Sequence, residues 1–383
     1  MRYLTAGESH GKGLTAILDG FPSLVPIDKA AVDAELRRRQ LGYGRGGRQK
    51  IEKDGAEITA GLFGGVTLGS PIAFFIANRD YASWQEFTDP ETGKIAEKAL
   101  TAVRPGHADL AGLIKYDFTD ARPILERASA RETAARVGVG AFCKQLLSHL
   151  GITVASHIVK IGGVSANVQA LPKDVNAAAD ADPVRCLEKA ASQKMCAAID
   201  EAKQKCDTLG GEAEILAFGV PVGLGSHTQH DCKLDALLCA ELMGIQSVKC
   251  VQVGLGASVA DLAGSEVHDE LFPDGKRITR KTNRAGGIEG GMSNGEPIVL
   301  RVSFKPIPTL MQGLQTVDVR TGKAVKAAAE RSDACAVPAA AVVAESAVAF
   351  VLANELLRVC GGDSLPKIRE AVERLRAREN GLL

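Results

Sequence analysis

Apolar residues recur with two different spacings along this chain of 383 residues, and the two spacings predict a mixture of strands and helices. Short apolar runs bounded by turn residues predict strands at Tyr3–Thr5, Leu14–Leu18, Ile58–Leu62, Ile72–Ile76, Ile152–Val164, Glu212–Val220, Val248–Val253 and Ile298–Phe304. Helical spacing predicts longer elements at Ile27–Gln40, Pro105–Tyr116, Glu126–Leu150, Lys233–Met243 and Leu365–Glu379.

The most apolar segment, Val337–Leu357, is long enough to cross a membrane. It also carries Glu345, Ser346, Asn354 and Glu355, which are costly inside a bilayer. Because the segment is apolar on nearly every face, we expect a helix that is buried between other layers of the protein.

No long linker divides the chain, so we expect one domain over residues 1–383. Between residues 166 and 211 the composition changes to Ala, Asp and Lys, with a helical stretch near Ala190–Cys206. We interpret this segment as a peripheral excursion that carries no chemistry.

The 46 basic and 46 acidic residues give a formal charge of zero, so no global field recruits nucleic acid or a membrane surface. Any anion must therefore be bound by a local basic cluster. The nine cysteines are odd in number and form no Cys-x-x-Cys pair, which favours reduced thiols in a cytoplasmic protein. The polar opening of the chain does not resemble a signal peptide.

The densest basic cluster is the segment 37–48, which holds five arginines and no lysine. The planar fork of arginine binds phosphate and carboxylate oxygens in pairs, whereas a solvated basic face would accept lysine equally well. The segment also matches Gly-x-Gly-x-x-Gly, but it follows a predicted helix rather than a strand, which argues against a dinucleotide site.

Two histidines lie at places suited to proton transfer. His10 stands in the turn Gly7–Gly11, and a solvated surface turn is the alternative interpretation. His107 stands in the segment Arg104–Asp109, where we expect the first turn of a helix, and a capping turn is the alternative. The segment His227–Cys232 superficially resembles a metal-binding cluster. No further ligands with zinc spacing complete it, so we expect no metal.

Other segments combine charge or glycine with predicted helix ends. Arg127 and Arg131 are four residues apart and should share one helix face, although a salt-bridged surface helix has the same pattern. Many glycines in 286–295 would expose backbone N–H groups to a flat or anionic ligand, unless the segment is simply a flexible loop. Asp333 precedes the apolar helix, where it could act chemically or as an N-terminal cap.

Seven segments, in order along nearly the whole chain, resemble the chorismate synthase family. They read GESHGKGL, RRQLGYGRGGRQKIE, RPGHADLAGLIKY, RASARETAARVGVGA, TNRAGGIEGGMSNGEPI, KPIPTL and RSDACAVP. The resemblance implies a lyase that converts 5-enolpyruvylshikimate 3-phosphate to chorismate by a 1,4-anti elimination of phosphate, in the shikimate pathway of aromatic amino-acid biosynthesis. It also implies reduced FMN as cofactor, an α+β fold in which long helices lie between antiparallel sheets (a β-α-β sandwich), and a homotetramer.

The resemblance also assigns roles to individual residues. His10 matches the histidine proposed to protonate the departing phosphate, His107 the one proposed to interact with reduced flavin, and Asp333 the acid near flavin N5. The arginines that match substrate-binding positions are Arg39, Arg45, Arg48, Arg104 and Arg131. The residues that match FMN contacts are Arg127, Ala128, Ser129, Gln246, Ser247, Gly291, Lys305, Pro306, Ile307, Pro308, Thr309 and Arg331.

Two other functions compete with this one. An RNA-binding module would need a basic chain and repeated arginine–glycine units with aromatics, whereas this chain is neutral and 4% aromatic. A catalytically inactive flavin-binding paralogue stays open, because only activity separates it from the lyase. The flavin-reductase form of the family, which would use NADPH, carries extra sequence for which this chain has little room. We therefore expect a separate flavin reductase to supply reduced FMN.

Overall fold

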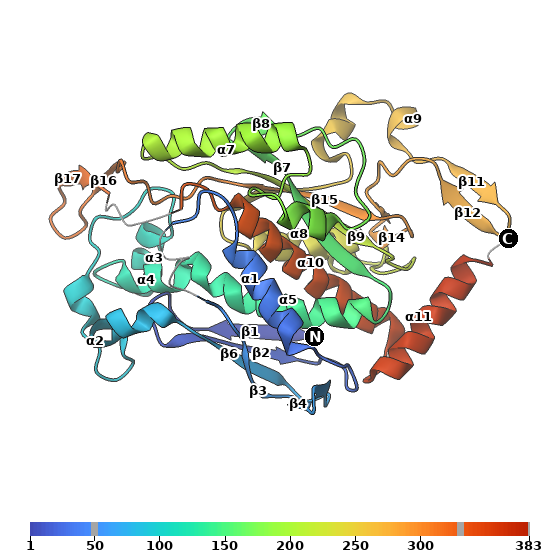
Figure 1. The fold of residues 1–383 in the computed structure, drawn as a ribbon, viewed down its shortest axis with the longest axis horizontal. Helices are drawn as coiled ribbons and strands as arrows, with labels where there is room; N and C mark the ends of the chain where they lie inside the picture. Colours follow the sequence, from blue (N-terminus) through green and yellow to red (C-terminus); the bar gives the residue numbers. More distant parts are fainter. Residues whose placement is uncertain (47–52, 328–332, 382–383) are drawn as a thin grey trace.

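Two antiparallel sheets enclose a layer of helices in the computed structural model, which describes residues 1–46, 53–327 and 333–381 (Figure 1). The first sheet has the order β1 (Arg2–Ala6), β2 (Gly13–Asp19), β6 (Ile72–Ala77) and β3 (Glu57–Ala60). The second has the order β10 (Val248–Val253), β15 (Ile298–Phe304), β9 (Gly211–Phe218), β7 (Thr153–Ile161) and β8 (Val164–Ser165). The expected β-α-β sandwich is confirmed.

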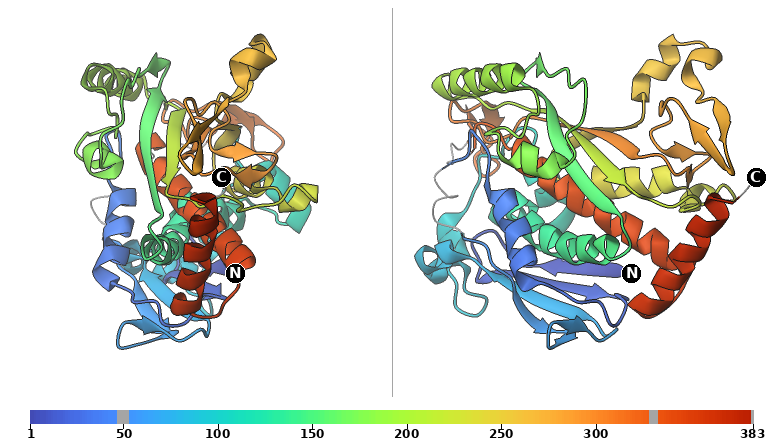
Figure 2. Two further views of the ribbon diagram at one scale, coloured as in Figure 1. Left: turned by 90° about the vertical axis from the view of Figure 1, so that its right-hand side faces the viewer. Right: turned by 45° about the vertical axis from the view of Figure 1, so that its right-hand side comes forward.

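Three helices form most of the middle layer, and each follows from a predicted helical pattern. They are α1 (Lys29–Gln40), α5 (Thr133–Ser148) and α10 (Val337–Cys360). Figure 2 shows them from two further sides, between the sheets. Gly140 of α5 allows α10 to approach closely, because a Cβ atom there would lie 2.2 Å from the Cβ of Ser346.

The central helix α10 is long and apolar enough to cross a membrane by length and composition, but 83% of its most apolar window is buried inside the protein. It packs against α5, α8 (Leu234–Met243), β7 and β9. The prediction of a helix covered on several sides is therefore confirmed. The strands of the first sheet cover α5 in the same manner, with Phe74 of β6 against Phe142 at a ring distance of 5.8 Å.

Two predicted helices differ from the observed ones. The single helix expected over Glu126–Leu150 is wrong, because extended backbone at Ser129 divides it into α4 (Arg122–Ala128), the turn η4 (Ala130–Glu132) and α5. The helix expected from Pro105 is α3 (Asp109–Tyr116), because Gly106 adopts a left-handed φ of +74°. His107 consequently precedes the helix and does not lie in its first turn.

The segment 166–211 contains α6 (Val175–Asp180) and α7 (Lys189–Gln204) and lies along the edge of the second sheet (Figure 1). Its inner side joins the main core through Val184, Met195 and Ile199.

The helix α11 (Leu365–Glu379) packs at the end of α10. Shorter elements complete the described chain: β4 (Leu62–Phe63), β5 (Val66–Thr67), η2 (Arg79–Ser83), α2 (Gln85–Thr88), η3 (Ile95–Lys98), η5 (His230–Cys232), η6 (Gly256–Asp261), α9 (Gly264–Val267), β11 (Leu271–Asp274), β12 (Arg277–Arg280), β13 (Ile288–Glu289), β14 (Met292–Ser293), β16 (Gln315–Val317) and β17 (Ala324–Lys326).

Glu345 lies at the centre of a buried ionic network that ties the helix layer to this segment. Its carboxylate, with no exposed surface, accepts from Arg38 at 2.9 Å, from Lys144 at 2.5 Å and from Arg185 at 3.0 Å. Burial opposes ionisation, but the three cations outweigh it and hold the pKa of Glu345 well below its usual range. The negative charge of α10 is therefore kept in the core by partners from α1, from α5 and from the segment 166–211.

We expect Glu345→Gln to lower the free energy of unfolding by about 3–5 kcal/mol, because it leaves three buried cations with only the two carboxylates of Glu35 and Asp180. Glu355→Gln on the same helix is the matched control, because the partner of Glu355, Arg358, is 44% exposed. This control substitution should lower the free energy of unfolding by about 1 kcal/mol or less. Urea denaturation at pH 7 measures both. In the wild type, the stabilisation that the ionised Glu345 contributes is fully present above the unfolded-state pKa of Glu. It is lost progressively as the pH falls from that value through the lower folded-state pKa of Glu345. Equal losses in the two variants would contradict the role given to Glu345.

Candidate active site

The turn between β1 and β2 presents His10 in a fixed orientation. The His10 Nδ1 atom lies 2.8 Å from Glu126 Oε1, and the His10 backbone N–H donates to Glu126 Oε2 at 2.8 Å. The imidazole stacks on Trp84 with ring centroids 4.1 Å apart, and its side chain is only 13% exposed. The solvated surface turn considered as an alternative is therefore wrong.

Glu126 comes from α4 and is itself buried. Burial raises its pKa, but the hydrogen bonds and charge of His10, together with the charge of Arg122, outweigh burial and lower it. Glu126 is thus held as a carboxylate that orients His10. The sequence pattern placed Glu126 only at the start of a predicted helix, so its contact with a residue 116 positions away was missed.

Arg39 and Arg131 converge on one buried carboxylate, that of Asp54. Arg131 Nη1 lies 2.7 Å from Asp54 Oδ2, and Arg39 Nη1 lies 3.6 Å from the same oxygen. Arg39 also donates to Thr133 Oγ1 at 2.9 Å and to the Ala130 carbonyl at 2.7 Å. Burial, together with the nearby charges of Arg131 and Arg45, lowers the pKa of Arg39 to about 9 in spite of Asp54. An added anion would relieve this crowding of cations.

Asp333 joins the same region through Arg45. Arg45 Nη1 lies 3.0 Å from Asp333 Oδ2, and the Gly46 N–H donates to Asp333 Oδ1 at 2.6 Å. The Nε atom of Arg45 is buried with no hydrogen-bond partner among the described residues. The α10 N-cap is Ala336 and no side chain caps it, so the capping role considered for Asp333 is wrong. Two further predicted site residues, Arg48 and Arg331, lie outside the described residues.

A third group surrounds Asp109 at the start of α3. Arg104 Nε donates to Asp109 Oδ2 at 2.9 Å, its Nη1 donates to Thr309 Oγ1 at 3.1 Å, and His107 Nδ1 contacts Asp109 Oδ1. Burial raises the pKa of Asp109, but His107 and Arg104 outweigh it and hold that pKa below its usual range. His107 is therefore oriented by a carboxylate, as His10 is.

Several residues expected to contact flavin lie beside this third group. Lys305 Nζ donates to the Gly106 carbonyl at 2.7 Å, and the Lys305 backbone N–H donates to the Ser247 carbonyl at 2.9 Å. Burial and the charge of Lys249 lower the pKa of Lys305, a cost that a bound phosphate would offset. From here the chain runs through Pro306, Ile307 and Pro308 to Thr309, which Arg104 holds.

The remaining flavin positions lie nearer to β1. Arg127 donates to the carbonyls of Gly7 and Thr5, and Gln246 Nε2 donates to Glu132 Oε2 at 3.1 Å. Arg127 is exposed, whereas Arg131 is buried, so the expected common helix face is wrong. The reason is the break at Ser129, which follows Ala128 and accepts from the Arg131 N–H.

Gly291 is the one described flavin position that this chain does not bring to the others. Its carbonyl accepts from the Leu234 N–H at the start of α8, whereas Gln246 follows the end of that helix. The ten residues of α8 therefore separate the two positions by about 15 Å.

Asn78, at the end of β6, is a residue that the sequence patterns did not single out. Its Nδ2 donates to the carbonyls of Glu8, Ser9 and Gly11, and its Oδ1 accepts from Arg131 Nε at 2.8 Å. It thus joins the turn of His10 to the arginine cluster. The Asn78 amide became visible only in the structure, because its partners lie 53 to 70 residues away.

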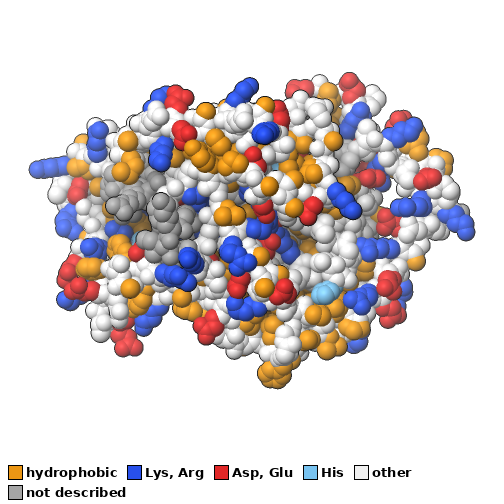
Figure 3. All heavy atoms as spheres, viewed as in Figure 1, with side chains coloured by type: hydrophobic (Ala, Val, Ile, Leu, Met, Phe, Trp, Pro, Cys, Tyr) orange, Lys and Arg blue, Asp and Glu red, His pale blue; other side chains and the backbone are white. Residues whose placement is uncertain are grey.

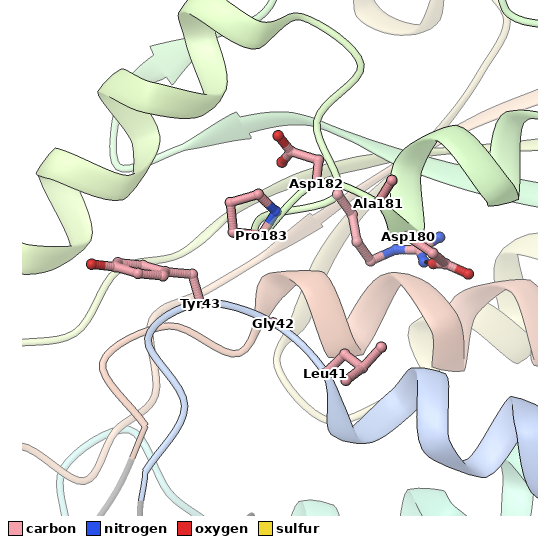
Figure 4. Close-up of a pocket in the computed structure, with 8 residues that line it drawn as sticks. Leu41, Gly42, Tyr43, Asp180, Ala181, Asp182 and Pro183 are labelled. Carbon is pink, nitrogen blue, oxygen red and sulfur yellow. Dashed lines mark ion pairs between the residues drawn. The ribbon is translucent and has the colours of Figure 1, made fainter.

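A cavity of about 400 Å³ lies between Leu41–Tyr43 and Asp180–Arg185 (Figure 4). None of the predicted site residues lines it, and Arg185 there belongs to the network around Glu345. On the surface, charges of both signs are interspersed over the face shown in Figure 3, in keeping with the zero net charge. The buried arginines are therefore the stronger candidate for an anion site.

The described residues also fit an anionic, flat cofactor. Gln246 Oε1 is buried with no hydrogen-bond partner among the described residues, so it could accept from a ring N–H. Lys305 and Arg127 supply cations for a phosphate. Together with two carboxylate-oriented histidines and a buried arginine cluster, this donor set can bind anions and transfer protons.

Comparison with known proteins points to one family. A family model described as chorismate synthase matches residues 1–357. The chain is 54% identical over 373 residues to the chorismate synthase of Moorella thermoacetica and 50% identical over 377 residues to that of Syntrophotalea carbinolica, covering 97% of both chains in each case. A crystal structure of a chorismate synthase superposes with a TM-score of 0.80 at 41% identity, covering 99% of this chain and 98% of the other.

We expect millimolar inorganic phosphate to raise the melting temperature of the wild type by about 2 °C or more, because it binds the crowded arginines of the folded state. Arg39→Met should abolish most of this rise. Arg37→Met, on the exposed face of the same helix, should keep it. Potassium chloride at equal ionic strength corrects for screening. An equal rise in all three proteins would show that phosphate acts elsewhere.

Proposed function

The chain belongs to the chorismate synthase family, whose members are lyases of the shikimate pathway, and from its site we propose the chemistry that it performs. We propose that it converts 5-enolpyruvylshikimate 3-phosphate to chorismate and phosphate by a 1,4-anti elimination that requires reduced FMN. The observation that carries the proposal is the junction at Asn78, where the turn of His10 meets the buried guanidinium of Arg131.

The charge of the site suits this substrate. A phosphate and two carboxylates give the substrate about four negative charges near neutral pH. Arg39, Arg45, Arg104 and Arg131 are all nearly buried and held by carboxylates or hydroxyls, so little side-chain entropy is lost when they bind an anion. Burial and the nearby charges of Arg131 and Arg45 lower the pKa of Arg39, so the departing phosphate would be attracted to this cluster.

His10 and Asp333 are suited to opposite proton transfers. Glu126 occupies the Nδ1 side of His10, so Nε2 is the atom that would deliver a proton to the departing phosphate. Asp333 is held in place by Arg45 and by the Gly46 N–H, so its carboxylate is positioned to accept the ring hydrogen as a proton. The acid and the base thus approach the arginine cluster from different elements.

When bound, reduced FMN would supply transient electron transfer to the substrate, with no net redox change. Lys305 and Arg127 would hold its phosphate, and Gln246 would contact its ring. His107, oriented by Asp109, would stabilise negative charge on the reduced ring. We also propose a cytoplasmic homotetramer that receives reduced FMN from a separate flavin reductase.

Anaerobic incubation with the enolpyruvyl phosphate and chemically reduced FMN should yield chorismate and phosphate in equal amounts. NADPH with oxidised FMN in the dark should give no turnover unless a flavin reductase is added, because we assign no NADPH-dependent reduction to this chain. Absence of chorismate with reduced FMN would favour the inactive paralogue. Sustained turnover with NADPH alone would contradict the need for an external reductase.

Asp333→Asn should lower turnover by about 10²-fold or more while FMN and substrate still bind, since it keeps the size and removes the basicity of the side chain. Asp19→Asn is the matched control, because Asp19 pairs with the exposed Arg2 at 3.1 Å, at the end of the β1–β2 hairpin opposite the turn of His10. Turnover and melting temperature are measured for both. Unchanged turnover of Asp333→Asn would remove Asp333 from the mechanism.

A further inference from the structure

We propose that Asn78 is a positioning residue that fixes the acid His10 relative to the phosphate-binding Arg131. The inference rests on the proposed function, because it assigns a task in that elimination to a residue outside the predicted site. It concerns geometry alone, since Asn78 does not titrate and acts through two other residues.

The Asn78 side chain has its two ends committed to two different parts of the site. Its Nδ2 donates to the carbonyls of Gly11 at 2.8 Å, Glu8 at 3.1 Å and Ser9 at 3.3 Å, which surround His10 on the chain. Its Oδ1 accepts from Arg131 Nε at 2.8 Å. Asn78 is 4% exposed, so bulk water does not replace these bonds.

An amide is the side chain that fits these partners. Carbonyl oxygens can only accept and a guanidinium can only donate, so the bridging group needs a donor at one end and an acceptor at the other. Aspartate would keep the acceptor for Arg131 but would turn an oxygen toward three carbonyl oxygens. Leucine would leave both sides unpaired. Asn78 precedes η2 but makes no capping hydrogen bond, so capping does not explain the residue.

The bridge continues on both sides into groups that are themselves fixed. Arg131 is held by Asp54, which also holds Arg39. On the other side, the Ser9 N–H donates to the Glu126 carbonyl at 2.9 Å, and Glu126 orients the His10 ring. The turn is thus held through its carbonyls by Asn78 and through its N–H groups by Glu126. Movement of this turn by about 1 Å would misplace the acid and could cost about 10²-fold in rate.

The test compares kcat and KM of the wild type and Asn78→Asp in the anaerobic assay with reduced FMN. We expect kcat to fall by about 10–100-fold with a change in KM of about threefold or less, because Arg131 keeps its partner. Asn78→Leu is the second variant and should lower both affinity and kcat. Asn176→Asp is the matched control, since Asn176 also joins backbone groups to an arginine, Arg185, away from the site. It should lower the melting temperature but leave kcat unchanged.

A double-mutant cycle separates positioning from general damage. In a His10→Ala background, Asn78→Asp should change kcat by about twofold or less, because its effect is exerted through His10. The full 10–100-fold loss repeated in that background would overturn the proposal, as would a wild-type kcat in Asn78→Asp.

Hydrogen exchange provides a readout that needs no turnover. The amides of Ser9 and His10 should exchange faster in Asn78→Asp than in the wild type or in Asn176→Asp. If the wild type itself made no chorismate, the proposed function would fail, and this measurement would still decide whether Asn78 holds the turn. Unchanged exchange of these two amides would overturn the inference.

Discussion

A buried guanidinium keeps its charge, so every arginine enclosed in this protein needs partners for its donors, and this requirement organises the candidate site. Arg39, Arg104 and Arg131 meet it with shared or single carboxylates, a threonine hydroxyl, a backbone carbonyl and one asparagine. Where Arg39 and Arg131 meet at Asp54, burial and the neighbouring cations lower the pKa of Arg39. An anionic substrate would relieve this crowding of cations, and anion binding and catalytic geometry would then depend on the same contacts.

The helix layer brings these groups together because three helix ends meet at one end of it (Figure 1). Arg39 ends α1, Arg131 directly precedes α5, and Asp333 precedes α10. The N-termini of the long helices α5 and α10 carry partial positive charge, which adds to the attraction of an anion. At the centre of the layer the arrangement is different, because the three cations Arg38, Lys144 and Arg185 are matched by the three carboxylates of Glu345, Glu35 and Asp180.

Periodicity in the sequence was sufficient to predict most strands and the buried helix α10, whereas the two sheets around helices were implied by the resemblance to the chorismate synthase family. It failed where a single residue changes the backbone direction: Ser129 breaks a helix that its flanking residues favour, and Gly106 delays α3. The motifs indicated His10, His107 and most arginines, because their residue types carry their own chemistry. Asn78, Asp54 and the role of Glu126 could not be predicted, since each depends on partners far along the chain that only the fold brings near.

The most direct test of this account is a structure of the protein with 5-enolpyruvylshikimate 3-phosphate and oxidised FMN bound. The account predicts the substrate phosphate within hydrogen-bond distance of His10 and of a guanidinium from the cluster around Asp54, with Asn78 still bonded to Arg131. A phosphate bound in another place, such as the cavity beside Arg185, with the arginine cluster unchanged and unliganded, would contradict it.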